Sequence, residues 1–308
     1  MDQKLLSIYI PTYNRVEKVI NQIKFFMNEI GDNENIELVV CDNASTDNTD
    51  KELKKINSNY PFRYFRNDEN IGICGNAYNA IQYTNGKYIW IVGDDDYLEY
   101  GVVKNVMNIL NSQKNLNFIF LNYADCYGKN KYGNAIYKGR SGLVEDTWSD
   151  VQKEFYKNSS LMVFTTCIIH RRTNMEIVVE MLPLDGNRDY GWSFLLGILA
   201  LKEGHGYFDS RIWIWDQLKD ISWSSMVLLS RRGLIRSLDV LEELGFEKKQ
   251  VRKYQKDVMQ HAGIYDLVMD ELLVSGPNKI NAIKLLLFMI RVDWKYVCRC
   301  FLGISKIE

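Results

Sequence analysis

Short apolar segments alternate with amphipathic segments over the first 123 residues, and this alternation constrains the fold more than any other feature. The apolar segments are rich in β-branched and aromatic residues and predict strands at residues 5–10, 36–41, 62–65, 88–92 and 118–123. Apolar residues recur at helical spacing between them and predict helices at residues 15–30, 47–56, 75–84 and 102–110. Strands that alternate with helices form a largely parallel sheet with both faces covered. The sequence therefore predicts an α/β fold.

Three of the predicted strands end in polar residues. The first is followed by residues 11–15, the second by residues 42–45, and the fourth by Asp94, Asp95 and Asp96, which we call the acid triplet. Ligands of such sheets bind at the carboxyl ends of the strands. Three adjacent carboxylates repel one another unless a cation neutralises them, and a Mg²⁺ or Mn²⁺ ion carrying a diphosphate would do so. A solvated loop or a helix N-terminus remains the simpler interpretation of the triplet alone.

Composition excludes several classes of protein. The 308 residues carry a net charge of -1, which gives no indication of a nucleic-acid partner. We expect no transmembrane span, because no run of eighteen uncharged apolar residues occurs. The first residues do not resemble a signal peptide, so we expect a cytoplasmic protein. The six cysteines form no CxxC pair, which favours reduced thiols and disfavours a zinc site.

The chain changes character twice along its length. Residues 124–150 lose periodicity and contain four glycines, which predicts an irregular stretch or a hairpin over the site. After about residue 222 the sequence becomes mostly helical, with repeated basic residues. We therefore expect an α/β domain over residues 1–220 and a helical C-terminal region over residues 221–308.

Four segments carry a resemblance to a known family. Residues 7–15, 39–47, 70–72 and 92–98 resemble, in order and spacing, the family 2 glycosyltransferases of GT-A fold, of the bacterial surface-polysaccharide type. The resemblance implies transfer of a sugar from a nucleotide-sugar donor, usually with inversion and with Mn²⁺ or Mg²⁺. It also divides the domain into a donor half (about 1–123) and an acceptor half (about 124–220).

The resemblance further implies a set of donor-binding residues, with a UDP-sugar as the expected donor. They are Pro11, Thr12, Tyr13, Arg15, Asp42, Asn43, Asn70, Gly72, Asn76, Asp94 and Lys219. Tyr13 would face the nucleobase, and the Asp42 carboxylate would accept a hydrogen bond from a base N–H. The Asp-Asn-Ala-Ser sequence that begins at Asp42 is also good chemistry for an Asx turn. Lys219 would replace an arginine that relatives place against the diphosphate.

The acid triplet departs from the family pattern, because Gly93 stands where many relatives carry an acid. Aligned on Leu98, the metal-binding acid falls on Asp95. Asp94 would bind ribose or the metal, and Asp96 would orient the loop or bind a metal-bound water. Because no acid stands at position 93, the activity could depend less strongly on a metal ion than in those relatives.

An inverting transfer needs a general base, and a carboxylate can serve. The resemblance favours Asp189, which precedes the apolar segment 192–201, with Asp185 as the alternate; an N-capping aspartate is the competing interpretation. The Gln-x-x-Arg-Trp motif of processive synthases is absent, which favours transfer of one sugar.

Candidates on the acceptor side are His170, Arg171, Trp192 and His205, each of which could equally be a core or surface residue. The acceptor would be a glycan or a polyprenyl-linked oligosaccharide.

Residues 280–301 combine apolar, aromatic and basic residues. They predict a helix on the inner face of the cell membrane, a helix packed on the core, or a contact in a homodimer. Two further functional hypotheses stay open. One is a degenerate nucleotide-sugar or carbohydrate-binding module, and the other is a sugar nucleotidyltransferase, which is disfavoured because residues 11–15 lack a Gly-rich phosphate loop.

Overall fold

The computed structural model describes residues 3–57, 61–126, 133–144, 164–182, 184, 191–202, 204–217, 237–261, 264–273 and 279–302. Its nine described strands form one sheet in the order β3-β2-β1-β4-β8-β6-β9-β5, with β7 paired to β9. The strands are β1 (Lys4–Thr12), β2 (Ile36–Asp42), β3 (Arg63–Arg66), β4 (Gly86–Ile91), β5 (Tyr97–Leu98), β6 (Leu116–Cys126), β7 (Gly142–Val144), β8 (Ile168–Arg171) and β9 (His205–Gln217). Each of the five strands predicted from the sequence is present in this sheet.

The sheet is mixed and mostly parallel, as expected. Strands β1, β2, β3, β4, β6 and β9 run in one direction, whereas β5, β7 and β8 run in the other. The carboxyl ends of β1, β2 and β4 consequently lie at the same edge of the sheet, which we call the carboxyl edge. This edge is where the sequence places its polar segments.

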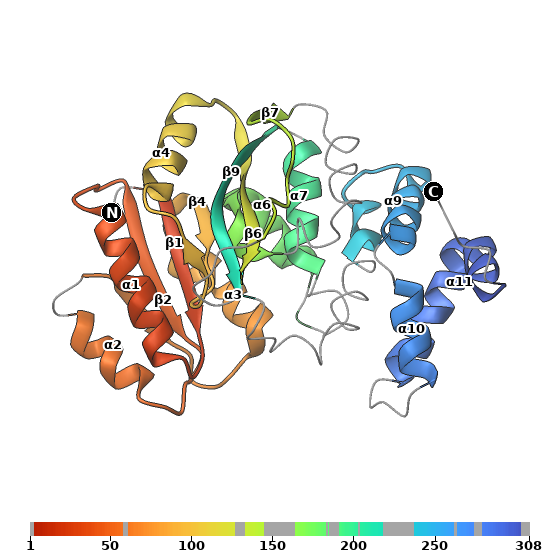
Figure 1. Cartoon of the computed structure of the whole chain (residues 1–308), viewed down its shortest axis with the longest axis horizontal. Helices are drawn as coiled ribbons and strands as arrows, with labels where there is room; N and C mark the ends of the chain where they lie inside the picture. The colour runs from red at the N-terminus through yellow and green to blue at the C-terminus, as the bar shows by residue number, and fades with distance from the viewer. Residues whose placement is uncertain are drawn as a thin grey trace.

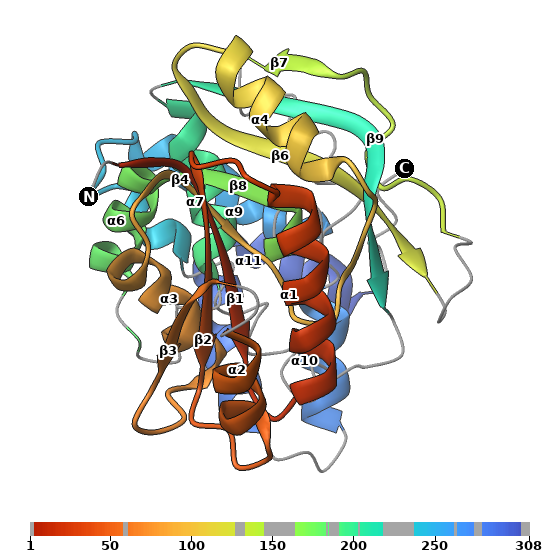
Figure 2. The same ribbon diagram turned by 90° about the vertical axis from the view of Figure 1, so that its left-hand side faces the viewer.

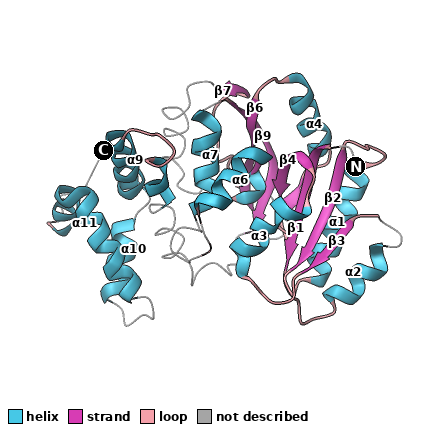
Figure 3. Cartoon of the chain, turned by 180° about the vertical axis from the view of Figure 1, so that it is seen from behind, coloured by secondary structure: helices cyan, strands magenta, loops and turns pink. Residues whose placement is uncertain are grey.

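Helices cover both faces of the sheet. They are α1 (Val16–Ile30), α2 (Thr49–Asn57), α3 (Gly72–Tyr83), α4 (Val102–Ser112), α6 (Arg172–Met181) and α7 (Trp192–Lys202), with a 3-10 turn η1 (Thr165–Cys167). Helices α1, α2 and α4 lie on one face, and α3, α6 and α7 on the other (Figures 1 and 3). Figure 2 shows the first strands between α1 and α3. This arrangement is an α/β sandwich of helix, sheet and helix.

Large apolar side chains fix the strand that leads to the acid triplet. Trp90 of β4 is fully buried, and its ring meets Phe26 of α1 edge-on, with 5.6 Å between the ring centroids. The Trp90 indole Nε1 donates to the carbonyl oxygen of Thr166 at 2.8 Å. Burial of one such side chain contributes about 1.5–3 kcal/mol, so β4 is a rigid support for the residues that follow it.

The C-terminal part of the described chain is helical. It contains a 3-10 turn η4 (Leu238–Leu241) and helices α9 (Lys248–His261), α10 (Ile264–Leu273) and α11 (Lys279–Phe301). Helices α9, α10 and α11 pack against one another at the end of the molecule far from α2 (Figure 1). None of the described helices is both long enough and apolar enough to cross a membrane. The boundary expected near residue 220 falls outside the described residues.

Candidate functional site

Strand register brings three polar segments together at the carboxyl edge. Thr12 of β1 lies opposite Asp42 of β2, and Tyr9 of β1 lies opposite Ile91 of β4. The Val92 amide still donates to the Tyr9 carbonyl at 2.9 Å, so the acid triplet begins directly beyond the last ladder bond. The end of β1, the end of β2 and the acid triplet therefore form one continuous edge, as the sequence predicts.

Asp94 is held inside this edge. Its carboxylate accepts hydrogen bonds from the Thr12 hydroxyl at 2.6 Å and from the Arg15 guanidinium at 3.0 Å, and its side chain is only 5% exposed. Burial raises the pKa of Asp94, and the bonds from Thr12 and Arg15 offset part of that rise. Asp94 thus links β1, α1 and the acid triplet, and protein donors already engage both of its oxygens.

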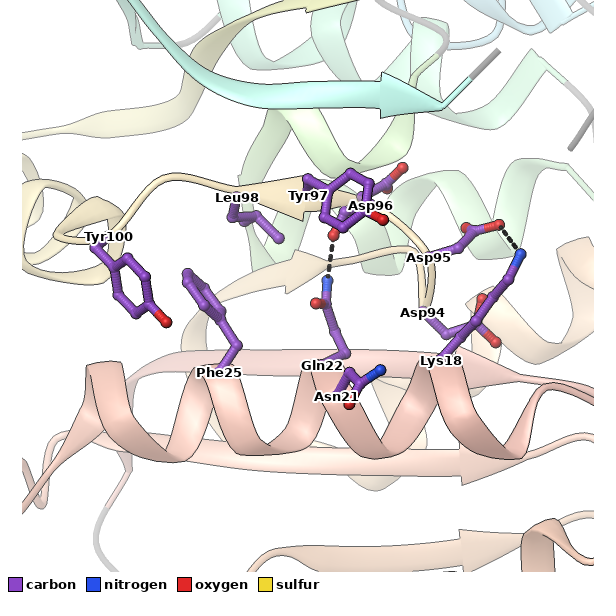
Figure 4. A pocket seen from close by; sticks show the side chains of 10 residues that line it. All are labelled: Lys18, Asn21, Gln22, Phe25, Asp94, Asp95, Asp96, Tyr97, Leu98 and Tyr100. Carbon is purple, nitrogen blue, oxygen red and sulfur yellow. Dashed lines mark hydrogen bonds and ion pairs between the residues drawn. The ribbon is translucent and has the colours of Figure 1, made fainter. Parts of the chain in front are cut away.

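Asp95 is the most accessible carboxylate of the triplet, with its side chain 21% exposed. It accepts from Arg15 Nη1 at 2.7 Å and lies 3.3 Å from Lys18 Nζ (Figure 4). The cations that separate the triplet's charges in this structure therefore come from the start of α1. Lys18 was not among the predicted site residues, although its spacing of three residues from Arg15 puts both side chains on one helix face.

Asp96 turns into the protein. It is buried and accepts from the Thr166 hydroxyl, which in turn accepts from the Gly93 amide at 2.8 Å. A Cβ atom at Gly93 would lie 2.5 Å from the Asp96 carboxylate oxygen. The carboxylate of Asp96 thus occupies the space in which a side chain at position 93 would begin. These contacts fit the loop-orienting role expected of Asp96, and its expected role beside a metal stays a prediction.

Asp42 is fully buried at the end of β2. Its carboxylate is paired with Arg66 at the end of β3, accepts from the Ser45 amide at 2.9 Å, and lies 3.4 Å from the Tyr64 hydroxyl. The Asp42 side chain thus bonds to the backbone three residues further on, which closes a local turn after β2. A ligand at this edge would therefore meet a carboxylate that is already paired with Arg66. Arg66 was not predicted as a site residue, although it directly follows the third predicted strand and could have been expected near Asp42 for that reason.

A network of asparagine side chains shapes the neighbouring loop. Asn43 Nδ2 donates to Asn70 Oδ1 at 2.8 Å and to the Gly72 carbonyl at 3.2 Å. Asn67 Nδ2 donates to Asn43 at 2.9 Å and to Asn76 at 3.2 Å. Asn43 and Asn76 are themselves buried. These two residues therefore hold the loop before α3 against β2, and the donor contact that the resemblance implies for them stays a prediction.

The loop after β1 is tied to the loop after β2. Asn14 has a left-handed backbone (φ 54°), and its side-chain oxygen accepts from the Thr46 amide at 2.7 Å. Ala44 is also left-handed (φ 60°), a conformation that costs a residue with a Cβ atom about 1–3 kcal/mol. Between these constrained positions the ring of Tyr13 stays exposed at the edge. Tyr13 is therefore placed where a flat ligand group could stack on it.

The four predicted acceptor residues do not lie at this edge, and their role in binding an acceptor stays a prediction. His170 lies in β8, buried between Ile89 of β4 and Phe118 of β6, and burial lowers its pKa to about 3. Its neighbour Arg171 pairs with Tyr88, still further from the acid triplet. His205 begins β9 opposite Leu116, at the other edge of the sheet.

Trp192 is buried as well and packs edge-on against Tyr78, with 6.2 Å between the ring centroids. The remaining predicted site residues, Asp185, Asp189 and Lys219, lie outside the described residues.

A groove of about 340 Å³ runs from the acid triplet along α1. It is lined by Lys18, Asn21, Gln22, Phe25, residues 94–98 and Tyr100 (Figure 4). Gln22 fixes its floor by donating to the Gly93 carbonyl at 3.0 Å and the Asp96 carbonyl at 3.2 Å. Phe25 and Tyr100 form a tilted ring pair at its far end. Acid, amide and aromatic groups together suit a ligand rich in hydroxyls.

Comparison with known families agrees with this geometry. Residues 7–177, more than half of the chain, match the model of glycosyl transferase family 2. The matched region contains β1, β2, β4, the acid triplet and Thr166, which is the whole of the carboxyl edge described above. The chain belongs to glycosyl transferase family 2.

Two curated relatives match part of the chain. Abequosyltransferase RfbV of Salmonella typhimurium is 36% identical over 114 residues, which are 36% of this chain and 34% of RfbV. The Escherichia coli protein WfaP, a UDP-Glc:alpha-D-GlcNAc-diphosphoundecaprenol beta-1,3-glucosyltransferase, is 26% identical over 124 residues, 40% of this chain and 47% of WfaP. The match thus spans about a third to a half of each relative.

Solved structures confirm the GT-A-like fold over nearly the whole chain. Staphylococcus aureus TarS, residues 1–349 in complex with UDP-GlcNAc, superposes with a TM-score of 0.72 at 15% identity and covers 94% of this chain and 81% of that one. Mannosyltransferase PcManGT of Pyrobaculum calidifontis, in complex with GDP-Man and Mn²⁺, gives a TM-score of 0.55 at 12% identity, covering 98% and 84%.

Proposed function

We propose that this protein transfers one sugar, with inversion, from a nucleotide-sugar donor to a glycan or polyprenyl-linked acceptor in the synthesis of a bacterial surface polysaccharide. The observation that carries the proposal is the carboxyl edge. It presents one accessible carboxylate, Asp95, between two cations, Arg15 and Lys18, beyond a rigid strand. Such an edge can bind a diphosphate, because cations and a carboxylate-held metal both neutralise phosphate charge.

The nucleoside would lie across the ends of β1 and β2. Tyr13 offers an exposed ring for stacking on the base, and Arg66, 35% exposed beside the buried Asp42, offers donors to the base edge. A UDP-sugar is the donor we favour, and the UDP-GlcNAc held by TarS supports this choice by likeness of fold. The sugar would then reach the groove along α1, where Gln22 and the aromatic residues lie.

A divalent metal fits this edge only if substrate phosphates and waters supply most of its ligands. The described residues contain no group of three histidine, cysteine or acidic side chains that could hold an ion. Asp94 and Asp96 are buried and bonded to protein donors, whereas Asp95 is partly exposed and meets Arg15 and Lys18 through Oδ2. Asp95 would therefore serve as a single protein ligand through its other oxygen. Mg²⁺ is commonly held by one or two carboxylates together with substrate phosphates and waters. When bound, Mn²⁺ or Mg²⁺ would neutralise the leaving diphosphate.

The chemical step requires a base on the acceptor side. The base takes the proton of an acceptor hydroxyl, whose oxygen bonds to the anomeric carbon as the bond from that carbon to the diphosphate oxygen breaks. We assign the base to Asp189, with Asp185 as the alternate, on the family resemblance of that segment. Arg15 and Lys18 would stabilise the charge that develops on the diphosphate, since both already lie within 3.3 Å of Asp95.

Gly93 does not argue for a degenerate binding module. The carboxylate of Asp96 fills the space beside Gly93 and is fixed by Thr166, so the edge retains a third acid in a rearranged position. The lipid-linked acceptor is supported by the relative WfaP, whose name describes action on a sugar carried by diphosphoundecaprenol. The absence of the Gln-x-x-Arg-Trp motif supports transfer of one sugar without processive extension.

The test is release of nucleotide from UDP-GlcNAc, UDP-glucose, UDP-galactose and GDP-mannose, with and without Mn²⁺. We expect one donor to be hydrolysed slowly, and Asp95→Asn to reduce that rate at least a hundredfold. Asp32→Asn makes the same chemical change in the exposed turn before β2, at the opposite edge, and should leave the rate unchanged. If the donor binds and neither hydrolysis nor transfer follows in the wild type, the protein is a binding module and the proposal is wrong.

A further inference from the structure

Helix α11 exposes an apolar stripe that its own packing does not use. Ile280, Ile283, Leu287 and Ile290 are 42–69% exposed and follow one another at intervals of three and four residues, so they share one helix face. Trp294, also exposed, comes directly after the non-helical residue Asp293 at the end of this stripe. The opposite face is buried, through Ala282, Leu285, Met289 and Val292. The helix is therefore anchored to its neighbours by one face while a second apolar face stays uncovered.

The exposed charges on α11 itself are positive. Lys279, Lys284, Arg291, Lys295 and Arg299 are all exposed on α11. The single acid of the helix, Asp293, is mostly buried and lies 3.6 Å from Lys256 Nζ. It also accepts from the Tyr296 amide at 3.2 Å. The surface that α11 presents is therefore apolar and basic, which is the composition of helices that lie in the interface of an anionic bilayer.

A pocket of about 440 Å³ opens beside the end of the stripe. It is lined by Lys256, Asp293, Trp294, Lys295, Cys298 and Arg299. Three of its six residues are cations and one is an aromatic residue. A phosphate group fits this lining, because ammonium and guanidinium groups can donate to its oxygens while Trp294 lies at the boundary between polar and apolar groups.

We propose that α11 binds the surface of an anionic phospholipid bilayer, with the stripe in the acyl boundary and a lipid phosphate in the pocket beside Trp294. A second copy of the chain fits less well, because the cations that flank one stripe would face those of the other. The backbone at Asp293 is also non-helical (φ −151°, ψ 81°), which interrupts the continuous seam that a long coiled coil requires.

This inference does not depend on the proposed sugar transfer, since it rests on residues of α9 and α11 alone. If both hold, the helix would keep the enzyme at the surface where a polyprenyl-linked acceptor lies.

The test is co-sedimentation of the full chain with vesicles of phosphatidylcholine, with and without phosphatidylglycerol. We expect binding only to the anionic vesicles, weakened by salt. Each basic residue near such a surface is worth about 1 kcal/mol, or about fivefold in partitioning, so the double variant Lys295→Gln, Arg299→Gln should partition about 30-fold less. The matched control Lys51→Gln, Lys104→Gln removes two exposed cations of α2 and α4 and should partition like the wild type.

A second pair of substitutions separates the possible occupants. Leu287→Ser with Trp294→Ser changes only exposed side chains, so the variant should keep the wild-type melting temperature and lose vesicle binding. Equal partitioning of the wild type and both variants would overturn the proposal. So would displacement from vesicles by millimolar inorganic phosphate alone, which would indicate a site for free phosphate. If light scattering shows a dimer that the serine variant converts to monomer, with vesicle binding unchanged, a second copy covers the stripe instead.

Discussion

Arg15 bonds to two carboxylates of the acid triplet, and its removal should lower the free energy of unfolding by a defined amount. Arg15 donates to Asp94 at 3.0 Å and to Asp95 at 2.7 Å. In the variant Arg15→Gln, the buried carboxylate of Asp94 keeps only the Thr12 hydroxyl as a side-chain donor among the bonds described above. We expect this variant to fold and to be less stable than the wild type at pH 7.

The size of the loss follows from burial. Breaking a fully buried ion pair costs about 3–5 kcal/mol, and a hydrogen bond to a charged group contributes about 1.5–3 kcal/mol. Because the side chain of Arg15 is 30% exposed, solvent screens part of its charge, and the lower range applies. We therefore expect the free energy of unfolding to fall by about 2 kcal/mol.

The loss should depend on pH in a defined direction. Burial raises the pKa of Asp94 and Arg15 lowers it, so the variant has the higher folded pKa. A carboxyl group whose folded pKa is raised makes the free energy of unfolding fall as pH rises through that pKa. The deficit of Arg15→Gln should thus be largest near neutral pH and shrink as Asp94 becomes protonated in acid.

Urea unfolding of a double-mutant cycle measures this effect. In the background Asp94→Asn there is no buried charge to stabilise, so Arg15→Gln should cost at least 1 kcal/mol less than it does in the wild type. An equal cost in both backgrounds, or a deficit that does not change with pH, would refute the assignment of Arg15 as the partner of Asp94.

Three further predictions concern residues around the edge and the sheet. Gly93→Ala places a Cβ atom against the carboxylate of Asp96 and should lower the free energy of unfolding by about 1–3 kcal/mol, measured by urea unfolding. Arg66→Gln removes the partner of the buried Asp42 and should cost about 1 kcal/mol and weaken UDP binding, measured by calorimetry. His170 has a folded pKa of about 3, below its ordinary 6.5, so wild-type stability should decline as pH falls from 6.5 towards 3. His170→Leu should remove that term, at most about 1.4 kcal/mol per pH unit, in unfolding free energies measured across this range.

Much of the fold could be predicted from local patterns. Strands β1 to β4, strand β6 and the helices between them are encoded by apolar periodicity, which acts over a few residues. The position of β8 between β4 and β6 could not be predicted, because strand pairing over long sequence separations leaves no local signal. His170 illustrates the consequence. Its neighbours Arg171 and Arg172 indicated an exposed basic turn, whereas the pairing of β8 buries the histidine completely.

The sequence was sufficient to predict the positions of the acidic residues of the site, but not the residues that bond to them. Asp42, Asp94 and Asp95 follow predicted strands and lie at one edge as expected. Thr166 reaches Asp96 from about 70 residues further along the chain, and no pattern near either residue indicates this contact. Arg66 was available to sequence reasoning as the basic residue that ends a strand beside Asp42, and its charge should have suggested a pair with that carboxylate.

The account rests on the claim that Asp95 is the carboxylate through which the carboxyl edge holds a metal-bound nucleoside diphosphate. Isothermal titration of UDP and of GDP into the wild type, Asp95→Asn and Asp32→Asn, each with and without Mn²⁺, tests it directly. We predict that one nucleotide binds the wild type and Asp32→Asn more tightly with Mn²⁺, and that Asp95→Asn loses at least tenfold in affinity and loses the Mn²⁺ dependence. Equal affinity and equal Mn²⁺ dependence in all three proteins would contradict the claim.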